Sequence, residues 1–84
     1  GDYVEQITGN KYSMVTGEYG VYVIDGNLDV EVGSGKARLK AASDILIDSD
    51  TKITLKVGTS SIVITSDSIT IMAKDGQGRI DINK

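Results

Sequence analysis

The chain has 84 residues and a formal net charge of −3, and it contains no Cys and no His. This composition excludes disulfides, zinc sites built on Cys or His, and catalytic dyads or triads that use those residues. The charges are scattered, without the basic stripe that a nucleic-acid backbone requires, so nucleic acid is not an expected partner. A chain this short buries a small fraction of its surface when it folds alone, and we expect oligomerisation to supply the missing stability.

The first part of the chain repeats an apolar residue, a spacer and a glycine. The repeats end at Gly9, Gly17 and Gly26, which are eight and then nine residues apart. Between the glycines apolar and polar residues alternate, as in a β-strand whose successive side chains point to opposite faces. The segment 24–28 contains Asp-Gly and is where we expect a two-residue hairpin turn.

The second part of the chain keeps the period but loses most of the glycines. Its polar connectors, 48–51, 58–61 and 65–68, mostly lack residues that adopt a positive φ readily, so we predict that they bend the chain at corners rather than reverse it. The absence of Pro favours an uninterrupted hydrogen-bonded ladder. We predict almost no helix, because apolar residues rarely recur three and four positions apart.

An eight-residue unit is too short to enclose a core, since single-chain solenoids need roughly twenty residues per coil. Three chains wound about a common axis can enclose one, with each block covering one side. We therefore predict an all-β fold, an intertwined homotrimeric triple-stranded β-helix in the form of a triangular prism with an eight-residue repeat. The expected trimer core consists of Ile45, Ile47, Ile53, Leu55, Val57, Ile62, Ile64, Ile69 and Ile71.

Two features of the sequence resemble a known family. The apolar-x-Gly repeats at Gly9 and Gly17, followed by the segment 61–74 (SIVITSDSITIMAK), look like the C-terminal β-helix of central spike proteins of contractile phage tails. They equally resemble the valine-glycine repeat proteins of type VI secretion systems. The resemblance covers nearly the whole chain, and it lies in the repeat pattern.

The resemblance implies a non-enzymatic, membrane-piercing spike that transmits axial force and touches the target cell envelope transiently. It places the chain in the virion, at the tail baseplate, or in a secreted injection apparatus. It also implies an upstream hub domain, and a conical cap protein of the proline-alanine-alanine-arginine repeat class at the tip. The residues expected to dock that cap are Ile80, Asp81, Ile82 and Asn83.

We treat residues 1–84 as a single β-helical segment. Because it begins with Gly rather than Met, we expect it to be a C-terminal fragment of a longer hub protein. No cofactor is expected, and an adventitious ion on the three-fold axis is left open. Asp44, Asp48 and Asp50 do not match the spacing of a calcium loop.

Two other functions remain open at this stage. One is a small monomeric all-β binding domain, seeded by the Asp25-Gly26 hairpin. The other is a glycan-contacting module of a trimeric tail fibre, for which an exposed aromatic platform is expected. A sedimentation mass near that of one chain would favour the monomeric binding domain over a spike. Binding of sugars by the chain would favour the glycan-contacting module.

Overall fold

The computed structural model describes residues 1–83 and assigns them four β-strands and no helix. The strands are β1 (Lys52–Val57), β2 (Ser60–Thr65), β3 (Ser68–Ala73) and β4 (Gly78–Asn83). The predicted all-β class is confirmed, and no helix in the described part of the chain could cross a membrane. The chain divides into two compact units, Gly1–Ala37 and Arg38–Lys84.

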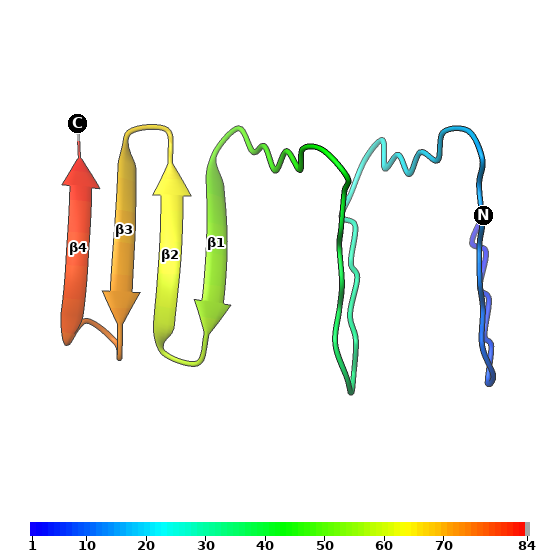
Figure 1. Cartoon of the computed structure of the whole chain (residues 1–84), viewed down its shortest axis with the longest axis horizontal. Coiled ribbons are helices and arrows are strands. Elements are labelled where there is room, and N and C mark those ends of the chain that lie inside the picture. The colour runs from blue at the N-terminus through cyan, green and yellow to red at the C-terminus, as the bar shows by residue number, and fades with distance from the viewer. Residues whose placement is uncertain (84) are drawn as a thin grey trace. The chain divides into compact units, whose positions relative to one another are not determined.

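The four strands form one antiparallel sheet in the order β1-β2-β3-β4, so each strand pairs with the next one along the chain (Figure 1). The register places Ile64 of β2 between Ile53 and Ile69, and Ile69 is paired in turn with Ile82. Such a register keeps side chains of one kind on one face, because side chains alternate with a period of two.

The connections β1–β2 and β2–β3 reverse the chain, so the prediction that these connectors act as shallow corners was wrong. Val57 pairs with Ser60, which leaves a two-residue turn whose Gly58 has a φ of 56°. In the next turn the hydroxyls of Thr65 and Ser68 lie 2.7 Å apart, and the Thr65 hydroxyl donates to Asp67 at 3.1 Å. A left-handed glycine and local side-chain hydrogen bonds close the two reversals.

The β3–β4 loop is held against the β1–β2 turn. Lys74 and Asp75 adopt positive φ values of 53° and 55°, which are unfavourable for residues other than glycine. The backbone N–H of Asp75 donates to the carbonyl of Thr59 at 2.9 Å, and that of Lys74 donates to the Ser60 hydroxyl at 3.1 Å. These two hydrogen bonds offset the strained backbone and join two turns at the same end of the sheet.

Residues 1–51 contain no assigned strand and consist of stretches separated by regularly spaced bends. The bends lie at 8–9, 16–17, 24–26, 33–35, 42–43 and 50–51, so the period of eight to nine residues predicted from the sequence is present as a period of the backbone. Of the connectors predicted to act as corners, 48–51 lies in this part; it contains one of the bends, and no strand pairing is assigned across it.

The hairpin predicted at Asp25-Gly26 is wrong. Gly26 has a φ of 109°, but Asp25 is not among the non-glycine residues with positive φ. With Asp25 at the first central position, neither a type I′ nor a type II′ turn can form, since both need a positive φ there. No strand is assigned on either side of Asp25-Gly26, so the hairpin is absent.

Candidate assembly surface

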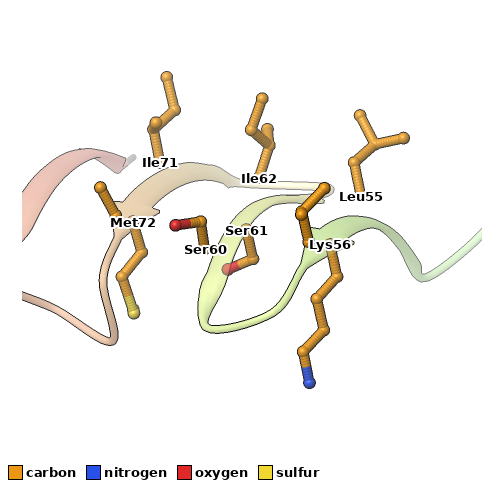
Figure 2. Close-up of a pocket in the computed structure, with 9 residues that line it drawn as sticks. Leu55, Lys56, Ser60, Ser61, Ile62, Ile71 and Met72 are labelled. Carbon is orange, nitrogen blue, oxygen red and sulfur yellow. The ribbon is translucent and has the colours of Figure 1, made fainter.

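One face of the sheet carries two rows of large apolar side chains, which we call the apolar sheet face. Each row crosses all four strands, because the register aligns the rows. Figure 2 shows Leu55, Ile62 and Ile71 on the same side of the sheet, with Lys56 and Met72 pointing to the other side. The two rows are Ile53, Ile64, Ile69, Ile82 and Leu55, Ile62, Ile71, Ile80.

The apolar sheet face has no covering layer within its own unit, of which residues 38–83 are described. The isoleucines of β2 and β3 are 37–39% exposed, and those of β4 are 56–57% exposed. No side chain among residues 1–83 is buried, so these residues form no hydrophobic core within one chain. Covering eight such side chains with another apolar surface contributes on the order of 1 kcal/mol each, so burial of this face favours association.

The apolar sheet face is nearly flat rather than hollowed. Two shallow depressions lie along its two ends. One is lined by residues around the β1–β2 turn, including Val57, Ser60 and Ala73, and the other by residues around the β2–β3 turn, including Ile64 and Ile69. Both are open and suit side chains from another apolar surface better than a small molecule, which binds in enclosed pockets.

The opposite face of the sheet is mostly polar, with half-buried Val63 and Met72 as its apolar residues on β2 and β3. Lys52, Thr54 and Lys56 lie there on β1, and on β4 the Arg79 Nε donates to Asp81 at 2.6 Å. This hydrogen bond lowers the pKa of the Asp81 carboxyl and raises the pKa of Arg79. The exposed charges indicate that this face stays in water while the other face is covered.

Seven of the nine predicted core residues lie on the apolar sheet face, where Val57 extends the set at the end of β1. The other two, Ile45 and Ile47, lie outside the sheet in the stretch between the bends at 42–43 and 50–51, and they are 50% and 63% exposed. They have the same spacing of two as the sheet residues, which is why the sequence grouped them together.

The four predicted tip residues lie on β4, which is an edge strand. Ile80 and Ile82 complete the two rows of the apolar sheet face, whereas Asp81 and Asn83 lie on the polar face. The four tip residues therefore lie on the same edge strand, but their side chains point to opposite faces of the sheet. Sequence reasoning missed that Ile80 and Ile82 belong to the apolar rows, although their spacing of two was the available signal.

In residues 1–51 the apolar residue just before a bend is the less exposed one. Ile7, Val15, Val23 and Val32 each precede a bend and are 45–49% exposed, whereas Met14 is 95% exposed. These four residues are eight, eight and nine positions apart. We call these four less exposed residues, one before each of the first four bends, the inward positions of the repeats.

The backbone of residues 1–51 makes no backbone–backbone hydrogen bond. The bonds found outside the strand ladder are two, and both belong to the turns of the sheet. A side-chain bond joins Lys11 to Glu5, and it lowers the pKa of the Glu5 carboxyl. Extended stretches rich in apolar residues, with unpaired backbone groups, are typical of strands whose partner is another chain.

Among residues 1–83 no three Asp, Glu, His or Cys side chains are grouped as a metal site would require. No family model, curated protein or solved structure matches the chain. The candidate site is therefore a surface for assembly, made of an apolar sheet face and a series of unpaired extended stretches.

Proposed function

We propose that the chain is a non-enzymatic structural segment that assembles into a homotrimeric, membrane-piercing spike of a contractile injection machine. The observation that carries this proposal is the uncovered apolar sheet face, in a chain in which no described side chain is buried. A monomeric binding domain would need a core of its own, and residues 1–83 provide none.

The dimensions of the sheet favour three copies. Six-residue strands are about 20 Å long, and packed sheets lie about 10 Å apart. In a three-sided prism with sides of about 20 Å, each face lies about 6 Å from the axis, close to half the spacing of packed sheets. The apolar side chains of three sheets fill that space, whereas a four-sided arrangement would leave a hollow centre.

The path of the chain in the proposed trimer differs between its two parts. Consecutive strands β1 to β4 fold back on one another, so one chain forms one side of the prism there. Residues 1–51 contain regularly spaced bends and no strand pairing within the chain. In the proposed trimer each stretch passes to the next side of the prism, where it pairs with stretches of the two other copies. The intertwined triple-stranded β-helix is proposed for residues 1–51 alone.

The proposed rod acts mechanically. Strands lie across its axis, the polar sheet face points to water, and the apolar side chains of three chains pack along its centre. An upstream hub domain delivers the axial force, and the rod transmits it to the target cell envelope. Resistance to buckling comes from the cooperative burial of apolar surface rather than from any single bond.

The edge of β4 is the proposed site for a conical cap protein of the proline-alanine-alanine-arginine repeat class. The outer side of β4 has no partner strand within the described residues, so its backbone groups are available to a cap. Three such edges surround the axis at one end of the proposed prism. The particle then belongs to a virion tail baseplate or to a secreted injection apparatus.

The oligomeric state in solution tests the proposal. We expect the chain to sediment as a trimer that survives mild SDS exposure, and Ile64→Asp to abolish the trimer because it places a charge on the apolar sheet face. Thr54→Asp is the control, since Thr54 is an exposed residue of the polar face on the neighbouring strand β1. A wild-type chain that sediments as a folded monomer or a dimer contradicts the spike.

A further inference from the structure

The two parts of the chain leave different groups without partners. In the sheet, the backbone ladder is complete within one chain apart from its two edges, and the apolar side chains of one face are uncovered. In residues 1–51 the backbone donors and acceptors have no backbone partner. The sheet therefore needs other copies only to cover a face, whereas residues 1–51 need them to form strands at all.

The sheet can set its register before it meets another chain. Each of its pairings joins neighbours in sequence through a short turn, and the bond from Asp75 to Thr59 fastens one turn to another. Pairings of this local kind form within microseconds, because little chain entropy is lost on closing short loops. The result is a surface with eight apolar side chains in two rows.

Residues 1–51 specify their register weakly. Their inward positions Ile7, Val15 and Val23 recur at intervals of eight, and only the step to Val32 is nine. A chain displaced by eight residues therefore still places Ile7 opposite Val15 and Val15 opposite Val23, and loses only the match at Val23. A strand whose pattern survives a shift is weakly specified in register. Something outside the repeats has to align the copies.

We propose that the sheet of residues 52–83 nucleates assembly: three preformed sheets dock first through their apolar faces, and residues 1–51 pair between copies only after this docking has aligned them. The proposal rests on the trimer proposed above. Docking at equal height along the axis covers both rows in every copy, whereas a displacement by one strand leaves Ile80 and Ile82 of one copy uncovered. The sheet thus supplies the alignment that the repeats lack.

Two matched substitutions in the full chain test the order. Ile71→Asp places a charge in the centre of the apolar sheet face, and Val15→Asp places one at an inward position of the repeats. Sedimentation gives the mass, and amide hydrogen exchange gives the protection of each part. We expect Val15→Asp to remain a trimer whose loss of protection is confined to residues 1–51.

We expect Ile71→Asp to lower the trimer fraction at least tenfold and to remove the protection of residues 1–51 as well. A trimeric Ile71→Asp variant overturns the proposal, and so does equal dissociation of the two variants. If the wild-type chain is not a trimer, the proposed spike is contradicted. If the wild-type chain is a trimer but Val15→Asp dissociates it and Ile71→Asp does not, only the nucleating role of the sheet is contradicted.

Refolding of the wild-type chain gives a second test that does not depend on variants. Pulsed hydrogen exchange during refolding should protect the amides of residues 53–82 before those of residues 1–51. The delay between the two should shorten as the protein concentration rises, because the later step follows association. Simultaneous protection of both parts, or earlier protection of residues 1–51, overturns the order.

Discussion

Residues 1–51 and residues 52–83 share a period of about eight residues and a β-branched apolar composition, yet only the second part forms a sheet within the chain. The difference lies in the connectors. Gly58 has a left-handed backbone in a two-residue reversal, whereas Gly9 and Gly17 have no positive φ and lie in bends across which no strands pair. A positive φ is not sufficient, since Gly26 and Gly35 also have one and no hairpin forms at either of them. The comparison teaches that a shared period does not by itself decide whether the next strand pairs with the same chain.

The largest expected difference between the two parts follows from proline. Ile62→Pro should abolish the sheet, because β2 is paired on both sides and proline cannot donate to the ladder. Tyr22→Pro should only lower the melting temperature of the proposed trimer, because in that assembly one stretch of residues 1–51 would lose one interchain hydrogen-bond donor. Far-UV circular dichroism and sedimentation measure both effects, and equal damage by the two substitutions would contradict the division of the chain.

Glycine to alanine substitutions should separate the two kinds of connector. Gly58→Ala should destabilise the sheet by about 1–2 kcal/mol, since an L-residue is disfavoured at its φ of 56°. A Cβ at Gly58 or at Gly9 meets no atom within 4 Å, so neither substitution creates a clash within one chain. Gly9→Ala should therefore carry no backbone strain, and denaturant unfolding of both variants checks the contrast. A Gly58→Ala chain as stable as the wild type would show that the turn is not left-handed.

A smaller effect is expected in the β2–β3 turn. Thr65→Val keeps the shape of the side chain but removes the hydroxyl that contacts Ser68 at 2.7 Å and Asp67 at 3.1 Å. We expect a loss of about 0.5–1.5 kcal/mol in the free energy of unfolding, the usual net contribution of a hydrogen bond. Thermal unfolding of Thr65→Val against Thr16→Val, whose hydroxyl has no such partner among the described residues, measures it. An equal change in the stability of the two variants would show that the Thr65 hydrogen bonds do not stabilise this turn.

The smallest expected effect is the response to acid. The pKa values of Asp81 and Glu5 are lowered by hydrogen bonds from Arg79 and Lys11. A carboxyl whose pKa is depressed in the folded state stabilises that state above its unfolded pKa, and the stabilisation is lost as the pH falls through the folded pKa. Both pairs are exposed, so we expect a shallow decline that Asp81→Asn and Glu5→Gln each reduce. Melting temperatures measured from neutral to acidic pH check it, and a rise in stability on acidification would contradict the sign.

The repeats of the sequence predicted much of the fold and of the assembly surface. The positions of the strands, the alternation of their faces and seven of the nine core residues on the apolar sheet face follow from the alternation of Ile and Val with polar residues. The reversals could not be predicted from composition. Ser66-Asp67 lacks glycine and closes through hydroxyl and carboxylate hydrogen bonds, whereas Asp25-Gly26 has the favoured residues but not the required φ at Asp25.

The sequence by itself determined the period, the apolar and polar faces, and the need for another surface to cover the apolar one, because these depend on the order of side chains along an extended backbone. Only the tertiary structure decided which repeats pair within one chain and which do not, since that depends on backbone angles at a few connectors. The tertiary structure likewise placed Ile80 and Ile82 in the apolar rows, since the register between β3 and β4 pairs them with Ile71 and Ile69.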